Sequence, residues 1–279
     1  MCLYPPYETL LRCVSICRMK MPVLFVSHGS PALPIEPGET GAAWRKLGAQ
    51  LPKPSAILII SAHWETSIPT VSRAVHPETI HDFYGFPAEL YELRYPAPGA
   101  PAMAQDAARA LQQADIPVQL DDTRGLDHGA WVPLSFMCPE ADIPVAQLSS
   151  QPDRDTAWHI ALGRALRPLR EQGVLIIGSG SITHNLRALF KHPQGEPAPG
   201  WVTEFCDWMA QRIKGGDLDA LGAYRTRAPH AVQNHPTDEH LLPLFVALGA
   251  ANRLDTAMHL NHVMTYGFLA MDAWLFDPV

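Results

Sequence analysis

The chain has 279 residues, of which 47% are hydrophobic and 18% are charged, and its formal net charge is -7. A chain of this composition can bury a substantial core, and α/β proteins of this size fold as one domain. The acidic balance, without a basic patch that carries interleaved aromatic residues, excludes nucleic-acid binding from our expectations and favours small-molecule chemistry.

The five cysteines form an odd number without CxxC spacing, which is typical of a reducing compartment, so we expect a cytoplasmic protein. Charged residues interrupt the apolar stretches of residues 1–20, and no other run is long enough to cross a membrane. Met19 and Met21 stand directly before the first predicted strand. We expect residues 1–20 to be a dispensable N-terminal extension and residues 21–279 to form a single α/β domain.

Two stretches, residues 23–28 and 57–63, share one pattern: a run of apolar, largely β-branched residues is followed by serine and then, directly or one residue later, by histidine. Such runs are typical of strands buried in a parallel sheet. Each strand is therefore predicted to end by presenting an imidazole, that of His28 or that of His63. Between them, residues 44–51 are predicted to form a short helix.

The middle of the chain begins with a long proline-rich passage, residues 66–100. Passages of this length inside compact domains usually shape a site. A helix is predicted over 101–114, where a proline occupies the first turn. Strands are predicted over 116–120 and 143–148, and a glycine-flanked loop between them carries His128.

The second half repeats the alternation of strands and helices. A short C-terminal tail is expected after the last of these predicted elements: a helix over 156–172, a strand over 174–177, helices over 201–214 and 237–248, and a strand over 257–264. Thr237 is expected to cap the last helix and to place His240 in its first turn, where the helix dipole disfavours the imidazolium. The alternation predicts an α/β fold with a mainly parallel or mixed central sheet, flanked by helices on both faces.

Three histidines, His28, His63 and His184, lie at or just beyond the carboxyl ends of predicted strands. In an open α/β sheet these ends face one common crevice, so we expect the three imidazoles to converge. His128 and His240 are expected near the same edge. Seven other histidines fit ordinary surface or core positions: His76, His81, His159, His192, His230, His259 and His262.

Several neutral imidazoles suit Zn²⁺, or Fe²⁺ with open coordination positions for a substrate and oxygen. The sequence contains no HExxH, GxSxG, P-loop or Rossmann glycine fingerprint. Three classes stay open on the residues alone: a metal-dependent oxygenase, a zinc-dependent hydrolase that uses the same histidine cluster, and a non-catalytic metal or small-ligand binder.

Six motifs together resemble one family, and they stand in its order across roughly residues 21–275. They are 27–31 (SHGSP), 61–64 (SAHW), 80–87 (IHDFYGFP), 126–129 (LDHG), 183–186 (THNL) and 236–240 (PTDEH). This set is similar to that of the DODA-type (4,5-DOPA) extradiol dioxygenases of the class III, LigB-like superfamily.

The resemblance implies a LigB-like fold and a non-haem metal-dependent enzyme that opens the ring of a DOPA-like catechol with O2. Fe²⁺ would serve activity, and Zn²⁺ is the other ion expected to bind. His28, His63 and His240 match positions that hold the metal. His184 matches one that completes a zinc-loaded site or acts as a base, and His128 matches a catalytic histidine that contacts the substrate or oxygen.

Two further residues near these motifs need an assignment. Related ring-cleaving enzymes use a carboxylate as the third ligand, and Glu239 is adjacent to His240. Neighbouring helical positions diverge by about 100°, so only one of the two faces the metal, and we expect His240. The passage from 81 to 95 is expected to form part of the substrate pocket or its lid, with Tyr84 as a candidate substrate contact. The expected partners are a catechol and O2, with no nucleic acid and no membrane.

Overall fold

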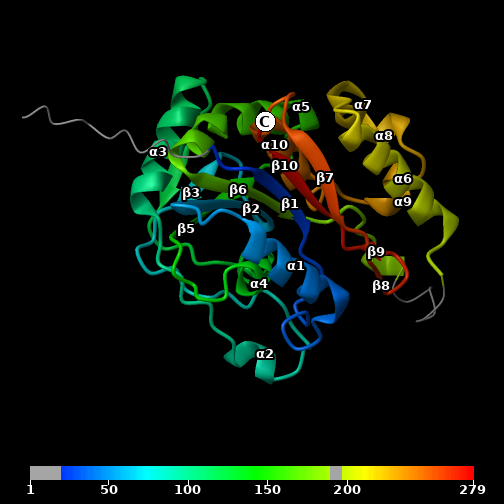
Figure 1. Ribbon diagram of the computed structural model, residues 1–279, viewed down its shortest axis with the longest axis horizontal. Coiled ribbons are helices and arrows are strands. Elements are labelled where there is room, and N and C mark those ends of the chain that lie inside the picture. Colours follow the sequence, from blue (N-terminus) through cyan, green and yellow to red (C-terminus); the bar gives the residue numbers. More distant parts are fainter. Residues whose placement is uncertain (1–19, 189–196) are drawn as a thin grey trace, which may run out of the picture.

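The computed structural model describes residues 20–188 and 197–279, and Figure 1 shows a central mixed sheet between helices. The predicted N-terminal extension, apart from Lys20, and His192 lie outside the described residues. Eight strands form the sheet in the order β4-β3-β5-β2-β6-β1-β10-β7. Their bounds are β1 (Val23–Ser27), β2 (Ala56–Glu65), β3 (Thr70–Ser72), β4 (Gln119–Asp121), β5 (Val145–Ser150), β6 (Val174–Gly180), β7 (Thr256–Asn261) and β10 (Ala273–Asp277).

The middle of the sheet is parallel, since β5, β2, β6 and β1 run in one direction. Residues 23–26 and 57–60 are fully buried, as their unbroken apolar runs predict for strands covered on both faces. Two antiparallel strands, β10 and β7, extend the sheet beyond β1, and β3 pairs antiparallel with β5. The sheet is therefore mixed, and the predicted α/β class is confirmed.

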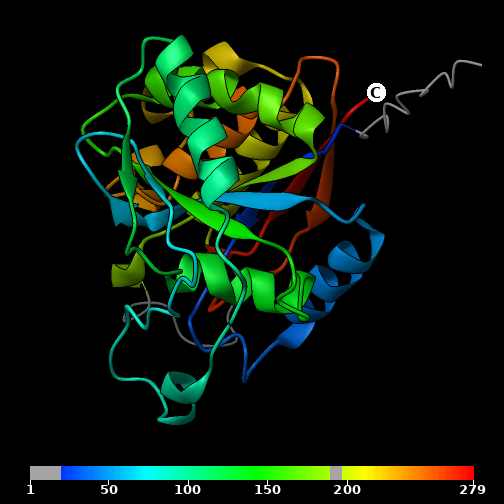
Figure 2. The ribbon, with the colours of Figure 1, turned by 90° about the vertical axis from the view of Figure 1, so that its left-hand side faces the viewer.

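Helices cover both faces of the sheet. Figures 1 and 2 show α1 and α4 on one face and α5 and α10 on the other, while α6 to α9, in yellow, stand beside β7. The helices are α1 (Gly38–Gln50), α2 (Glu89–Glu92), α3 (Pro101–Gln113), α4 (His128–Met137), α5 (Thr156–Leu166), α6 (Gly200–Lys214), α7 (Leu218–Gly222), α8 (Tyr224–Arg227), α9 (Ala231–Asn234) and α10 (Leu242–Ala250). Two 3-10 turns, η1 (Arg167–Gln172) and η2 (Leu186–Ala188), follow α5 and β6.

The prediction for the last helix was wrong at its start. Helix α10 begins at Leu242, with Pro243 in its first turn, so Thr237 does not cap it and His240 lies in the turn before it. Proline is pre-organised for the first turn of a helix, and this placement outweighs the capping preference of a threonine. A helix dipole therefore does not act on His240 in the way that was expected.

Four other expectations need correction. The prediction of a short C-terminal tail is wrong, because these residues form β10, which pairs with β1 and β7 inside the sheet. The predicted strand over 257–264 is divided into β7 and β8 (Met264–Thr265), and β8 forms a small hairpin with β9 (Leu269–Ala270). His128 begins helix α4 and does not lie in a loop. The short helix predicted over 44–51 starts earlier, at Gly38, as part of α1.

The buried apolar side chains of the described residues form one cluster around the sheet. Within residues 20–188 and 197–279, no helix combines the length and the apolar character that crossing a bilayer requires. The sheet matters for function because its carboxyl edge carries the segments that follow β1 and β6, together with the end of β2.

Candidate metal centre

Five histidines from five separate segments converge at the carboxyl edge of the sheet. The ring centroids of His28 and His63 are 4.8 Å apart, and those of His63 and His128 are 3.9 Å apart. His240 lies 5.4 Å from His28 and 4.9 Å from His63, and His184 stacks on it at 3.3 Å. The structure therefore brings together all five imidazoles that the sequence singled out.

The potential ligand atoms fall into two adjacent groups of three. One group is His28, His63 and His128, and the other is His184, Glu239 and His240; within each group the atoms lie within 4.8 Å of one another. The Nε2 atoms of His28 and His63 are 3.0 Å apart.

A serine behind the site determines the tautomer of His28. The Ser179 hydroxyl donates its proton to the carbonyl oxygen of Gly129, and its oxygen lies 3.1 Å from Nδ1 of His28. A hydroxyl has one proton to give, so Nδ1 of His28 is the donor in the second bond. The lone pair of His28 is therefore on Nε2, the atom that faces His63. Such outer partners commonly orient metal-binding imidazoles.

The carboxylate of Asp82 holds His128 in the same way. One oxygen of Asp82 accepts the backbone N–H of His128 at 2.9 Å, and the other lies 3.0 Å from His128 Nδ1 and 3.5 Å from His63 Nδ1. Burial raises the pKa of Asp82, but the hydrogen bonds and the charge of His128 outweigh this and lower it to about 2. An ionised carboxylate only accepts, so Nδ1 of His128 is the donor in this bond, and Nε2 is the nitrogen that Asp82 does not engage.

Glu239 supports the remaining two histidines. Its carboxylate lies 2.9 Å from Nδ1 of His240 and 3.8 Å from Nδ1 of His184. The turn that carries His240 packs directly on β6, where a Cβ on Gly180 would lie 2.1 Å from the carbonyl oxygen of His240. A side chain at position 180 would push this turn away, so the glycine permits His240 to reach the site.

Burial keeps these imidazoles neutral. It lowers the pKa of His63 to about 4, with a further contribution from His128, and that of His184 to about 4, partly opposed by Glu239. Burial followed by repulsion from neighbouring imidazoles also lowers the pKa of His28 and of His240 well below the usual value. Neutral imidazoles have a lone pair to offer, as metal ligands require.

The histidines form one end of a cavity of about 530 Å³. Apolar side chains from three segments make its walls, among them Phe86, Leu186, Phe268 and Leu269. This volume and lining are typical of a small-molecule site. A cavity of this size can hold a single aromatic ring beside the imidazoles.

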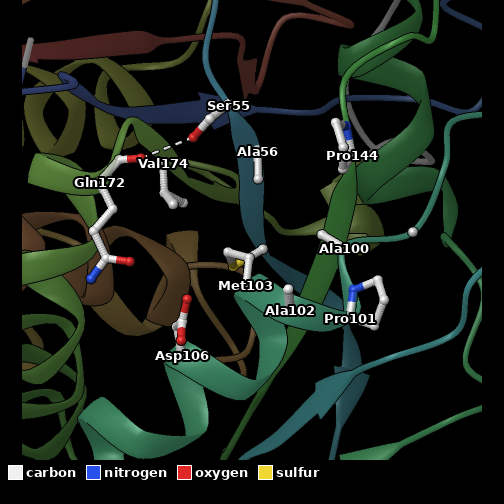
Figure 3. Close-up of a pocket in the computed structure, with 11 residues that line it drawn as sticks. Ser55, Ala56, Ala100, Pro101, Ala102, Met103, Asp106, Pro144, Gln172 and Val174 are labelled. Carbon is white, nitrogen blue, oxygen red and sulfur yellow. Dashed lines mark hydrogen bonds between the residues drawn. The ribbon is translucent and has the colours of Figure 1, made fainter. Parts of the chain in front are cut away.

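A different cavity, of about 290 Å³, lies at the opposite edge of the sheet, where β2 and β6 begin with Ala56 and Val174 (Figure 3). Its lining is mostly alanine, proline, methionine and valine, and Asp106 is the charged member of the set. It contains no histidine or cysteine among its lining residues, so it offers no comparable chemistry.

Comparisons with known proteins agree with this geometry. Residues 22–273 match the family described as the catalytic LigB subunit of aromatic ring-opening dioxygenase. The chain belongs to the LigB family. It is 42% identical to a 4,5-DOPA dioxygenase extradiol of Beta vulgaris, over 87% of this chain and 93% of that protein. It is also 42% identical to one of Escherichia coli K12, over 86% and 89%.

A solved structure supports the same assignment. The crystal structure of an uncharacterized protein from Escherichia coli K12 superposes with a TM-score of 0.78 at 35% sequence identity. It covers 92% of this chain and 99% of its own. The resemblance noted in the sequence is therefore confirmed, as is the LigB-like fold.

LigB dioxygenases depend on a metal, and the residues present fit one. Two of the imidazoles expected to hold the metal, those of His28 and His240, have Nδ1 engaged by an oxygen, which leaves Nε2 with its lone pair. Nε2 of the third, His63, lies 3.0 Å from Nε2 of His28. Nitrogen donors of this kind suit both iron and zinc.

Tyr84 is not part of the group that the structure brings together. Its side chain is 90% exposed and it is absent from the residues that line the cavity of about 530 Å³ beside the histidines, whereas Phe86 from the same passage does line it. The assignment of Tyr84 as a substrate contact stays a prediction.

Sequence reasoning missed the carboxylate that anchors α4. Asp127 is fully buried and caps α4 by accepting the N–H of Ala130; it also accepts hydrogen bonds from Ser61, Arg124 and Gln147. These bonds tie the start of α4, and so His128, to strands β2 and β5. The signal was present, since aspartate is a preferred capping residue and stands directly before His128.

Proposed function

We propose that this chain is an extradiol dioxygenase, an oxidoreductase that opens the ring of a DOPA-like catechol and incorporates both atoms of O2. The observation that carries the proposal is the apolar cavity of about 530 Å³ that ends on five converging imidazoles. The relatives named 4,5-DOPA dioxygenase extradiol support a catechol as the substrate class.

We assign the metal to His28, His63 and His240, with His184 as a fourth nitrogen when zinc is bound. Fe²⁺ is the ion proposed for activity, and Zn²⁺ is expected to bind the same donors readily. When bound, the ion supplies Lewis-acid activation of the catechol and holds it together with O2. Glu239 orients His240 from behind through its bond to Nδ1 and is not proposed as a ligand.

His128 is proposed to take the proton of the second catechol hydroxyl. Its Nε2 is free because Asp82 engages Nδ1, and its ring lies 3.9 Å from that of His63. The negative charge of Asp82 stabilises the imidazolium that forms, as an aspartate does beside a general-base histidine. His128 can return this proton to an oxygen of the product later in the reaction.

His184 is proposed as the second proton-handling group. Its pKa of about 4 leaves it neutral at pH 7, and it stacks on His240 beside the cavity. It can therefore accept a hydrogen bond from the substrate, or donate one to the substrate or to oxygen. The reaction breaks the ring C–C bond next to one hydroxyl-bearing carbon, and no external reductant is needed because both oxygen atoms remain in the product.

The test is anaerobic reconstitution with Fe²⁺, followed by admission of O2 in the presence of a catechol panel that includes DOPA. Stoichiometric oxygen uptake and a yellow ring-opened semialdehyde are expected. Ester or amide hydrolysis with Zn²⁺ and no oxygen uptake would instead establish the zinc-dependent hydrolase. Metal binding without turnover in either assay would indicate a non-catalytic binder.

We further propose a cytoplasmic enzyme whose residues 21–279 form one catalytic domain. The two described cysteines, Cys138 and Cys206, are free thiols, which suits a reducing compartment. The single apolar core and the family match over residues 22–273 support one domain.

A further inference from the structure

A second group of metal-binding side chains lies outside the catalytic cavity, at the antiparallel edge of the sheet. His259 belongs to β7, His262 follows that strand, and Asp272 directly precedes β10. One potential ligand atom from each lies within 4.8 Å of the others. Nε2 of His259 is 2.6 Å from Oδ1 of Asp272, and Nδ1 of His262 is 3.6 Å from the same oxygen.

The carboxylate at the centre of this group is deeply buried. Asp272 is 2% exposed, and among the described residues its Oδ2 atom has no hydrogen-bond partner. A buried carboxylate oxygen without a donor is costly, and buried charges are commonly paired or coordinate metals. Asp272 therefore has the capacity to accept a cation in addition to its contacts with the two imidazoles.

The two histidines provide one fixed donor and one accessible donor. The ring of His259 stacks on Trp274 with centroids 4.1 Å apart and an interplanar angle of 3°, which holds Nε2 toward Asp272. The side chain of His262 is 65% exposed, so an ion and its water ligands can reach the group from solvent. The bulky aromatic partner fixes one side of the site and leaves the other side open.

We propose that His259, His262 and Asp272 bind a divalent first-row transition-metal ion, for which Zn²⁺ is the representative. Two imidazole nitrogens and one carboxylate oxygen are donors that zinc accepts, with water in the fourth position. Ligands about 2.1 Å from a tetrahedral ion are about 3.4 Å apart. The separations of 2.6 and 3.6 Å bracket this value, so small side-chain rotations complete the geometry.

The position of the group gives the ion a structural role. His262 and Asp272 flank the β8–β9 hairpin, whose base is closed by the bond from the N–H of Met271 to the carbonyl oxygen of Val263, 2.8 Å long. This hairpin contributes Tyr266, Phe268 and Leu269 to the wall of the catalytic cavity. An ion at its base would tie the two arms together. The link to the substrate wall rests on the proposed function, whereas the binding of the ion does not.

Metal counting tests the proposal on the full chain. The wild-type protein and the variants His262→Gln, Asp272→Asn and His76→Gln are dialysed against buffered Zn²⁺, and total zinc and iron per chain are measured by mass spectrometry. His76 is an exposed histidine that belongs to neither group, and it serves as the matched control. Two equivalents are expected for the wild type and the control, and one for each of the other variants.

His262→Gln is informative because its exposed side chain can be replaced without disturbing the core, and circular dichroism verifies folding. The same count in the wild type and in His262→Gln would overturn the proposal, whatever the total. The group would then be a hydrogen-bonded cluster only. Neither outcome depends on catechol turnover, so this test can fail while the proposed activity stands.

Hydrogen exchange tests the structural role separately. Zn²⁺ is expected to slow the exchange of the amides of residues 263–271 in the wild type and in His76→Gln, and to leave His262→Gln unchanged. If Zn²⁺ slowed the exchange of this segment equally in the wild type and in His262→Gln, the ion would not tie the arms of the hairpin together, and the structural role would be rejected.

Discussion

The part of the chain that the structure describes contains two histidine groups suited to bind a metal, and they differ in how the chain builds them. The group that we propose to be catalytic, called the catalytic group below, collects side chains from positions 28, 63, 128, 184 and 240, so almost every layer of the fold must be in place before it exists. The hairpin group takes its members from 14 consecutive residues, 259–272. The first group faces a cavity, and the second joins two neighbouring strands. The group assembled from distant segments lines a cavity, whereas the local group lies at the base of the β8–β9 hairpin.

Their carboxylates also differ in position. In the catalytic group Asp82 and Glu239 contact the Nδ1 atoms of His128 and His240 and lie behind them, which leaves the Nε2 atoms in front. In the hairpin group Asp272 stands between the two imidazoles. The first arrangement keeps coordination positions open for reactants, and the second brings the charge of a carboxylate directly onto a cation.

The largest effect should come from removing a nitrogen donor of the catalytic group. His63→Ala is expected to lower oxygen uptake with a catechol by roughly 1,000-fold or more, about 4 kcal/mol in the barrier, because metal-supplied activation is lost. Iron content measured on the same sample should fall as well. His76→Ala, an exposed histidine, is the control and should retain both. Full iron occupancy with undiminished turnover in His63→Ala would contradict the role of His63 as a metal ligand, and with it the functional distinction between the two groups.

A smaller effect is expected from the carboxylate behind the donors. Asp82→Asn should reduce kcat by roughly 10–100-fold while iron content and KM change little, because His128 loses the partner that orients it and stabilises its protonated form. The pH profile of kcat should shift as well, which a purely structural role would not cause. Asp122→Asn removes an exposed carboxylate paired with Arg73 and is the matched control. Unchanged kcat in Asp82→Asn would remove the assignment of His128 as the base.

The sequence predicted the parts of the fold that depend on local runs. The strands before His28 and His63 were evident because four consecutive apolar residues need burial on both faces. Helix α4 was missed because nine of its ten residues are buried, so it shows no amphipathic period, and Pro133 lies inside it.

The supporting residues of the site could not be predicted in this way. Asp82 contacts His128 across 46 positions of sequence, and Ser179 contacts His28 across 151. No local pattern reports such pairs. The start of α10 was misplaced because Thr237 and Pro243 are both acceptable start signals, and only the packing of the His240 turn on β6 decides between them.

The buried histidines around the catalytic group predict a moderate dependence of stability on pH. His235 is fully buried, and burial lowers its pKa to about 4. The unfolded chain takes up a proton near pH 6.5 and the folded chain does not, so the free energy of unfolding should fall as the pH drops from about 6.5 to about 4. Above pH 6.5 this residue should contribute no slope. Urea unfolding across this range measures the effect.

His235→Gln is the matched variant for this measurement. Glutamine can still donate to the carbonyl oxygen of Ile182, which lies 2.7 Å from Nε2 of His235, and it does not titrate. The slope of the free energy of unfolding between about pH 6.5 and pH 4 should therefore be shallower than in the wild type. An identical slope would show that His235 is protonated equally in both states.

The smallest effect is expected at Tyr84. Its side chain is 90% exposed and does not line the cavity, so Tyr84→Ala should change KM for a catechol by less than about twofold in either direction, as surface substitutions usually do. Phe86→Ala is the informative partner, because Phe86 lines the cavity and packs on Phe83 with ring centroids 5.3 Å apart. Its removal should raise KM more than that of Tyr84. The reverse order would mean that the passage from 81 to 95 closes over the substrate and brings Tyr84 inward, which would restore the contact that the sequence suggested.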